Sequence, residues 1–268
     1  MNIIGLGNCG CSIAEEFAKY PQYNIFYIDT EPRQGKNSYL IAQQDHPEGY
    51  ERECPDLTNF LNCNGEVIFI LGGSGYVSAA SLRILEKIKH CKITILYIKD
   101  SPDLLSERSR LQQRATFHIL QEYTRSGVFE QIFLIDNACI GDIVGEVSIV
   151  EYYKRLNQTI APAIHFINVF NNSKPVMSTF YPFADTSRIR TVGIKNIKTG
   201  TEKMFFSLDN RVETRYYYAI SGQSLKEDAT LNNKIRGQVR KENERTSFGI
   251  FETDYDDNFC YSLVCGRE

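Results

Sequence analysis

The sequence of 268 residues lacks the features that mark membrane-spanning, zinc-binding and disulfide-stabilised proteins. No apolar run approaches the ~20 residues that a helix needs to cross a bilayer. No basic segment followed by an apolar run precedes the first strand, so we expect no secretion signal. The eight cysteines form no CxxC pair, and the four histidines show neither HxxxH nor HxH spacing. We therefore expect reduced thiols and no zinc site.

An excess of positive charge is also missing. The formal net charge is −3, and no basic stripe runs along the chain. This argues against nucleic acid as a direct partner, and the absence of long apolar runs argues against a membrane. With 42% hydrophobic and 24% charged residues, the composition is that of an ordinary globular protein with one large domain or two small ones. We expect a cytoplasmic location.

A glycine-rich turn is the most informative feature that is present. The apolar run Ile68–Leu71 leads into Gly72-Gly73-Ser74-Gly75, and a helical pattern follows from Tyr76. A buried strand that feeds such a turn at a helix N-terminus makes a phosphate site, because backbone N–H groups point outward and the helix dipole favours negative charge. Glycine allows the backbone to approach the ligand closely.

A second turn of this kind lies at the start of the chain, in Gly5-Leu-Gly-Asn-Cys-Gly10. It separates an expected strand at 2–6 from an expected helix at 12–20, and the next strand, 23–28, ends at Asp29-Thr-Glu31. A GxGxxG turn with an acid about twenty residues later is the dinucleotide fingerprint. An NAD-dependent Rossmann dehydrogenase is therefore one interpretation, and a tight turn without a ligand is another.

The presence of two glycine turns favours a different pocket, because a dinucleotide fold does not need the second one. The first turn would hold the inner phosphates of a nucleotide, and the second would hold the terminal phosphate. Asp29 and Glu31 would then lie near a Mg²⁺ ion that bridges the phosphates.

The order of elements predicts an α/β protein. We expect a Rossmann-like domain with a parallel sheet over residues 1–145, a long central helix over 146–170, and a smaller α+β domain over 171–268. In the second domain, the run Tyr216-Tyr-Tyr218 should place its middle ring on the opposite face from the other two, divided between core and surface. The remaining expected elements are strands 66–71, 92–98, 132–135, 190–194, 203–207 and 215–220, helices 56–61, 76–89, 104–123, 146–168 and 224–244, and a closing hairpin of 247–251 with 258–264.

The chain resembles the tubulin/FtsZ superfamily of GTPases, as a divergent, short member without a tail. Gly5–Gly10 resembles the first phosphate loop of that family, and Gly72–Gly75 matches the first four residues of its GGTGTG/GGTGSG signature, with Ser for Thr. Asp29-Thr-Glu31, Ile135-Asp-Asn137, and the pair Tyr153 and Asn157 follow in the family's order. The end of the chain, from Ala219-Ile-Ser-Gly222 to the closing strands, is also similar.

The resemblance implies that the chain binds GTP or GDP with Mg²⁺. Tyr153 and Asn157 are spaced i, i+4 and so lie on one helix face, where a ring and an amide are suited to read guanine. Arg110 would contact ribose or phosphate, although it also fits a solvated helix start. The expected cofactor-binding residues are Gly5, Gly7, Asn8, Cys9, Gly10, Asp29, Glu31, Gly72, Gly73, Ser74, Gly75, Tyr76, Arg110, Asn137, Tyr153 and Asn157.

The resemblance also implies GTP hydrolysis coupled to head-to-tail assembly of a homopolymer, with Asp185 completing the site of the next subunit. Three departures favour an alternative, a module of the same fold that neither hydrolyses nor polymerises. Tyr76 and Val77 replace the end of the signature, Phe180 and Pro182 stand where the family has an Asn and a first acid, and the chain ends two residues after Gly266. The sequence indicates neither an adaptor protein nor a cellular role.

Overall fold

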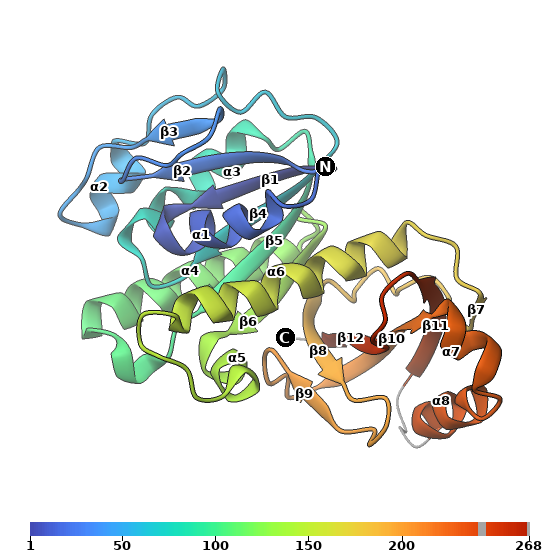
Figure 1. Ribbon diagram of the computed structural model, residues 1–268. Helices are drawn as coiled ribbons and strands as arrows, with labels where there is room; N and C mark the ends of the chain where they lie inside the picture. Colours follow the sequence, from blue (N-terminus) through green and yellow to red (C-terminus); the bar gives the residue numbers. More distant parts are fainter. Residues whose placement is uncertain (241–244, 267–268) are drawn as a thin grey trace. The chain divides into compact units, whose positions relative to one another are not determined.

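The computed structural model describes residues 1–240 and 245–266 (Figure 1). The chain divides into two compact units, of which unit 1 spans Met1–Pro162 and unit 2 begins at Ala163. This boundary falls inside helix α6 (Tyr152–Asn171), so the central helix contributes residues to both units. Among the described residues, no helix is both long enough and apolar enough to cross a membrane.

Unit 1 contains a parallel sheet in the order β3-β2-β1-β4-β5-β6. The inner strands are nearly continuous apolar runs, which is typical of parallel strands that are covered on both faces. The bounds are β1 Asn2–Leu6, β2 Asn24–Asp29, β3 Ser38–Leu40, β4 Glu66–Gly72, β5 Lys92–Lys99 and β6 Gln131–Asp136.

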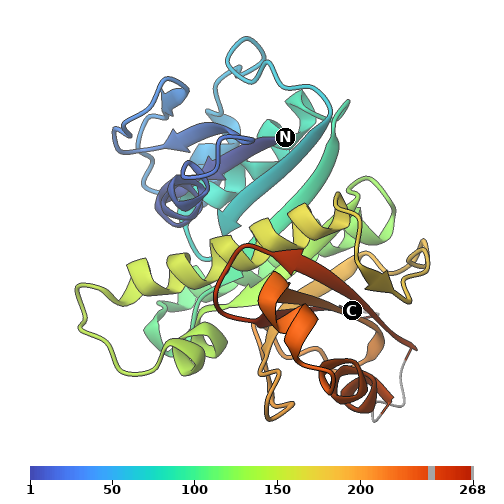
Figure 2. The ribbon, with the colours of Figure 1, turned by 45° about the vertical axis from the view of Figure 1, so that its right-hand side comes forward.

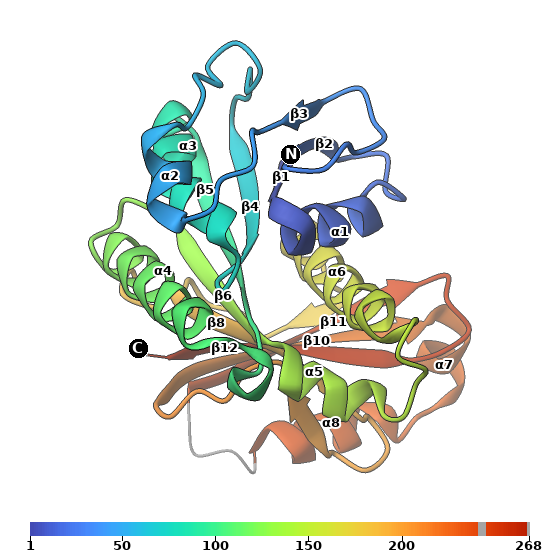
Figure 3. The same cartoon turned by 90° about the vertical axis from the view of Figure 1, so that its left-hand side faces the viewer.

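Helices cover this sheet on both sides. Figure 3 shows α1 on one side of β1 and β4, and α2, α3 and α4 on the other. The helices of unit 1 are α1 Gly7–Phe17, α2 Pro47–Arg52, the 3₁₀ turn η1 Tyr76–Ala80, α3 Ser81–Lys87, the 3₁₀ turn η2 Pro102–Leu104, α4 Glu107–Arg125, α5 Asn137–Val144 and the first half of α6.

Several helix predictions in unit 1 were wrong in detail. The helix expected at 12–20 is α1, which begins at Gly7 inside the glycine turn and ends at Phe17. Residues 56–61 form turns instead of a helix, because Asp56 Oδ1 accepts hydrogen bonds from both the N–H and the hydroxyl of Thr58. Residues 76–89 begin as the 3₁₀ turn η1 before α3. The long helix begins at Tyr152 and not at residue 146, and it continues through Pro162.

Unit 2 contains a mixed sheet in the order β8-β12-β10-β11-β7, with β9 paired to β8. Figure 2 shows α7 and α8, drawn in orange to red, against one face of its strands. The bounds are β7 Met177–Ser178, β8 Ile189–Lys195, β9 Glu202–Met204, β10 Arg211–Ser221, α7 Gly222–Glu227, α8 Leu231–Arg240, β11 Arg245–Thr253 and β12 Phe259–Gly266.

The predicted closing hairpin was wrong, because β10 lies between its two strands. β11 pairs parallel to β10, and β12 pairs antiparallel to the other edge of β10. The rings of Tyr216 and Tyr218 pack with α8, whereas Tyr217 points to the opposite face and donates a hydrogen bond to Asn171 Oδ1 at 2.8 Å. The alternation is confirmed, but all three tyrosines are fully buried and none reaches the surface.

The helix predicted over 224–244 is two helices. Asp228 Oδ1 accepts hydrogen bonds from the N–H and hydroxyl of Thr230, and this turn separates α7 from α8. The end of the predicted helix, residues 241–244, lies outside the described residues.

Candidate functional site

A cavity of about 290 Å³ lies in unit 1 at the carboxyl ends of the parallel strands. Ligands bind at this edge in open α/β sheets, because the loops that follow neighbouring strands meet there. The cavity brings together residues from both glycine turns, the start of α5 and the start of α6. Its lining residues are Leu6, Gly7, Asn8, Cys9, Ser12, Gly72, Ser74, Gly75, Val77, Asp100, Asn137, Tyr153 and Asn157.

The first glycine turn presents the N-terminus of α1 to the cavity. Gly7 adopts φ +68°, a conformation that favours glycine, and a Cβ there would lie 2.5 Å from Val77 Cγ1. Among the described residues, no side chain caps α1, and its first turn contains no acid. The N–H groups of this turn therefore remain available, and the helix dipole favours an anion beside them.

Three of the predicted glycines support the turns from behind and do not line the cavity. A Cβ on Gly5 would lie 2.6 Å from the Gly10 carbonyl oxygen, and one on Gly10 would lie 2.3 Å from the Ile70 carbonyl oxygen. These two glycines let α1 pack directly against the sheet. A Cβ on Gly73 would lie 2.0 Å from the Tyr97 hydroxyl. Direct contact of these three with a ligand stays a prediction.

The second glycine turn lines the cavity with Gly72, Ser74 and Gly75. Its backbone is fixed, since the Gly73 N–H donates to the Ile98 carbonyl oxygen at 2.9 Å. Within the described residues, a Cβ on Gly75 would have nothing within 4 Å, so this part of the turn is open. Tyr76 is not among the lining residues, and the guanidinium carbon of Arg108 lies 5.6 Å from the centre of its ring.

Asp100 connects the second glycine turn to Asn137, and the sequence interpretation missed it. One carboxylate oxygen accepts a hydrogen bond from Asn137 Nδ2 at 2.7 Å, and the other accepts from the Ser74 hydroxyl. The Asp100 N–H in turn donates to Gln113 Oε1 at 2.9 Å. Its position directly after a buried strand, at the same edge as the glycine turns, was the available signal.

Tyr153 and Asn157 lie one helical turn apart in the part of α6 that belongs to unit 1, and both line the cavity. The helix is held there by Leu156 and Ile160, which are fully buried. Tyr153 remains 57% exposed, and its ring makes a T-shaped contact with the Tyr152 ring at 5.4 Å between centroids. Burial, and then the charge of Asp100, raises the pKa of Tyr153, which keeps the phenol neutral.

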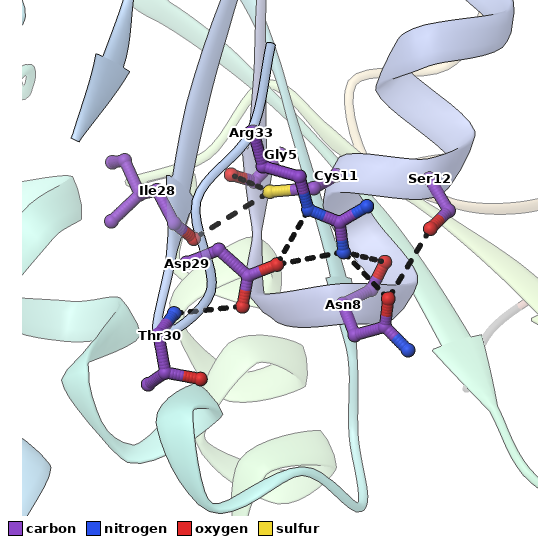
Figure 4. A network of polar contacts seen from close by, with 8 residues as sticks. All are labelled: Gly5, Asn8, Cys11, Ser12, Ile28, Asp29, Thr30 and Arg33. Atoms are coloured by element: carbon purple, nitrogen blue, oxygen red, sulfur yellow. Dashed lines mark hydrogen bonds and ion pairs between the residues drawn. The ribbon is translucent and has the colours of Figure 1, made fainter. Parts of the chain in front are cut away.

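Asp29 lies beside the first turn but outside the cavity lining. Its Oδ2 accepts from Arg33 Nε at 2.8 Å and lies 2.7 Å from Arg33 Nη2, while its Oδ1 accepts from the Thr30 N–H at 2.8 Å. Figure 4 shows that Arg33 also donates to Asn8 Oδ1, at 2.5 Å. The sequence interpretation missed Arg33, although its spacing of four residues from Asp29 was a possible signal.

Two other predicted residues, Glu31 and Arg110, also lie outside the lining, and both are exposed. The Arg110 Nε–H donates to the Pro102 carbonyl oxygen at 2.9 Å. Their contact with a ligand stays a prediction.

The arrangement does not fit a Mg²⁺ site built from protein carboxylates. Among the described residues, no group of three or more His, Cys, Asp and Glu side chains could hold a metal ion. Both oxygens of Asp100 are engaged by Ser74 and Asn137, and both oxygens of Asp29 are engaged by Arg33 and Thr30.

Solved structures share this architecture over almost the whole chain. FtsZ from M. jannaschii has a TM-score of 0.74 at 10% identity, covering 99% of this chain and 90% of the other. CetZ2 from Haloferax volcanii, in a GTPγS-bound protofilament, gives 0.71 at 12% identity, covering 99% and 92%. TubZ from Bacillus thuringiensis serovar israelensis, in GDP-form protofilaments, gives 0.64 at 14% identity, covering 99% and 85%.

The chain has the tubulin/FtsZ fold. The predicted fold class is therefore confirmed, and so is the resemblance on which it was based. No protein-family model matches the sequence, and no curated protein matches it. At these identities the likeness establishes the fold of the chain and nothing more.

In this tubulin/FtsZ fold, the predicted catalytic residue Asp185 belongs to unit 2 and is exposed, in the segment between β7 and β8. The residues before it are anchored by aromatic contacts. The Phe180 ring lies 5.3 Å from that of Tyr217, and the guanidinium carbon of Arg215 lies 3.3 Å from the centre of the Phe183 ring. A catalytic role for Asp185 stays a prediction.

Proposed function

We propose that this protein binds a guanine nucleotide in the cavity at the carboxyl edge of the unit 1 sheet. One observation carries the proposal: a single cavity is lined by the uncapped N-terminus of α1, by the open turn at Gly75, and by Asn137, Tyr153 and Asn157. The first two are suited to phosphates, and the last three are suited to a base.

Each group has a defined task in this proposal. The N–H groups of the first turn of α1 donate to phosphate oxygens. The Ser74 hydroxyl donates to Asp100 and so holds the second turn in place. Asp100 accepts from the Asn137 amide nitrogen, which fixes the orientation of that amide and leaves its oxygen available to guanine donors. The Tyr153 ring provides a stacking surface for the base.

Filament assembly with GTP hydrolysis is the second part of the proposal. Structures of the same fold are described as GTPγS-bound and GDP-form protofilaments, which supports both the nucleotide and self-association. In a head-to-tail filament, Asp185 of one subunit would orient the attacking water at the nucleotide of the next. Because such a contact joins two different surfaces, it would build an open polymer.

A second candidate is a module that binds the nucleotide without hydrolysing it. Its support is that Phe180, where the family has an Asn, is committed to packing, since a Cβ on Gly249 would lie 2.6 Å from its ring. This position cannot supply a polar group to a reaction. One carboxylate, Asp185, would then have to act alone, which favours slow or absent hydrolysis.

Thermal unfolding with GDP, GTP and NAD tests the binding proposal. A bound nucleotide at one hundred times its Kd adds ~2.7 kcal/mol of stability. We expect GDP and GTP to raise the Tm and NAD to leave it unchanged. Asp100→Asn should weaken the guanine response, whereas Asp103→Asn, an exposed residue in the same connection, should not. A response to NAD alone would support the dehydrogenase alternative.

Phosphate release and light scattering with GTP and GDP test the second part. Asp185→Ala should abolish phosphate release while leaving nucleotide binding intact, and the exposed control Asp256→Ala should match the wild type. Phosphate release near background in the wild type, unchanged in Asp185→Ala, would favour the second candidate. If no polymer forms with GTP at high protein concentration, the assembly proposal is wrong.

A further inference from the structure

Arg33 occupies a fixed position beside the first glycine turn. Its Nε and Nη2 both lie within 2.8 Å of one oxygen of Asp29, and its Nη2 also donates to the side chain of Asn8 at 2.5 Å and to the Asn8 carbonyl oxygen at 3.4 Å. Only 19% of the Arg33 side chain and 4% of the Asp29 side chain are exposed. As Figure 4 shows, the guanidinium is held between β2 and the start of α1.

Because Asp29 is paired with Arg33, its carboxylate is not free to bind a metal ion. A magnesium ion at Asp29 would meet one carboxylate oxygen that is bound to the Arg33 guanidinium and another that accepts from the Thr30 N–H, and the two cations would repel each other. Removing Arg33 from the pair would leave a buried charge without a partner, which is strongly unfavourable. Mg²⁺ also sheds its water reluctantly and is usually bound through one or two carboxylates together with substrate phosphates. The geometry therefore opposes a metal contact at Asp29.

Arg33 also determines what Asn8 presents to the cavity. A guanidinium can only donate hydrogen bonds, so the Asn8 atom that faces it must be the amide oxygen. The Ser12 hydroxyl contacts the same oxygen at 3.4 Å. The amide nitrogen of Asn8, a residue that lines the cavity, is thereby left to act as a donor. A donor at this position suits a phosphate and disfavours a metal cation.

We propose that Arg33, held by Asp29 and Asn8, replaces a protein-bound magnesium ion on the inner-phosphate side of the cavity, so that guanine nucleotides bind without a divalent cation. This inference rests on the proposed guanine-nucleotide function. The guanidinium is not itself among the lining residues, but it supplies positive charge behind Asn8 in the first turn of α1, and its planar fork keeps both Asp29 and Asn8 in place.

Equilibrium binding of GDP and GTPγS, with excess Mg²⁺ or with excess EDTA, tests the proposal on the wild-type protein. The Kd should agree within about twofold between the two conditions, since each 1.4 kcal/mol of cation contribution would change it tenfold. A Kd that rises more than about tenfold in EDTA would overturn the inference. Failure of both nucleotides to bind in either condition would instead overturn the proposed function.

Substitution of Arg33 should create the missing metal dependence. Arg33→Gln frees Asp29, so binding in EDTA should weaken by about tenfold or more and recover in Mg²⁺. In Asp29→Asn/Arg33→Gln the recovery should disappear, because the carboxylate that Arg33→Gln exposes is then removed. Lys36→Gln removes an exposed cation three residues further along the chain and should behave like the wild type. Equal binding of Arg33→Gln in EDTA and Mg²⁺ would contradict the proposal.

A folding defect in a variant must be distinguished from a loss of nucleotide binding. Thermal unfolding without nucleotide identifies a folding defect in Arg33→Gln. If that variant does not fold, Arg33→Lys provides the test, because it keeps the charge but not the fork. We expect Arg33→Lys to bind more weakly than the wild type and to remain indifferent to Mg²⁺. If Arg33→Lys required Mg²⁺ for nucleotide binding, the proposal that the positive charge of residue 33 takes the place of a magnesium ion would be wrong.

Discussion

At the scale of single residues, two glycines of the turns have opposite surroundings. A Cβ on Gly10 would lie 2.3 Å from the Ile70 carbonyl oxygen, whereas one on Gly75 would meet no described atom within 4 Å. Gly75 has φ −71° and ψ 138°, which alanine adopts without strain. Packing therefore requires glycine at position 10, whereas position 75 requires glycine only if a ligand approaches it.

Gly10→Ala should lower the free energy of unfolding by about 1–3 kcal/mol, because the backbone must move to accommodate the methyl group. Gly75→Ala should change it by less than about 1 kcal/mol. The same Gly75→Ala protein should bind GDP more weakly than the wild type. Urea unfolding and GDP titration measure the two effects, and unchanged GDP affinity in Gly75→Ala would contradict a phosphate contact at this turn.

His165 introduces a pH dependence into the stability of unit 2. Burial lowers the pKa of His165 to about 4, from 6.5, and the residue is 6% exposed. Below pH 6.5 the unfolded chain takes up a proton that the folded state does not accept until about pH 4. The free energy of unfolding therefore has its full value above pH 6.5 and decreases as the pH falls toward 4.

This loss should reach about 3 kcal/mol between pH 7 and pH 4. His165→Gln should remove that part of the pH dependence, while His118→Gln, at an exposed position, should leave it unchanged. Urea unfolding at pH 7, 5.5 and 4 measures the difference between the variants. Parallel pH profiles for His165→Gln and the wild type would show that His165 is not the group responsible.

At the scale of elements, β10 contains a buried ion pair. Glu213 is fully buried and its Oε1 lies 3.6 Å from Arg215 Nε. Arg215 also packs over the Phe183 ring and donates to the Tyr181 carbonyl oxygen. The pair thus connects the central strand of unit 2 to the segment that leads to Asp185.

Arg215→Met should destabilise the protein by about 3–5 kcal/mol, because it leaves the Glu213 charge buried without a partner. Glu213→Gln/Arg215→Met should recover a large part of that loss. Arg211→Met, at the start of β10, removes a partly exposed ion pair with Glu202 of β9 and should cost about 1 kcal/mol or less. Denaturant unfolding measures all three, and a double variant as unstable as Arg215→Met would argue against the charge as the cause.

At the scale of the whole molecule, the proposed filament divides one active site between two subunits. Asp100→Asn should impair the nucleotide cavity, and Asp185→Ala should impair the catalytic contribution to the neighbour. In a mixed filament, some junctions would pair an intact cavity with an intact Asp185. Neither variant alone would have such a junction.

A mixture of Asp100→Asn and Asp185→Ala should therefore regain part of the wild-type phosphate release, although each variant alone stays near background. Phosphate release at constant total protein measures the recovery. The variant Asp103→Asn keeps both the cavity and Asp185, so its mixture with Asp185→Ala gives the upper limit of the phosphate release that can be recovered. A mixture no more active than its two components would exclude catalysis shared between subunits.

Local sequence patterns were sufficient to predict much of the fold of this protein. Continuous apolar runs such as Ile68–Leu71 predict parallel strands that are covered on both faces, and the glycines after them predict the turns, because both depend on neighbouring residues alone. The order of these features was enough to predict the tubulin/FtsZ fold, which the structural comparisons confirm. The sequence also placed Asn137, Tyr153 and Asn157 at what proved to be a common cavity.

Only the tertiary structure determined which distant residues become partners. The closing strands could form a hairpin or accept β10 between them, and the second arrangement buries both faces of Tyr216–Tyr218. Arg33 donates to Asn8, which lies 25 positions earlier in the chain, and Asp100 accepts hydrogen bonds from the distant residues Ser74 and Asn137. Hydrogen-bond partners and strand neighbours depend on non-local packing, which the pattern of residues along one segment does not contain.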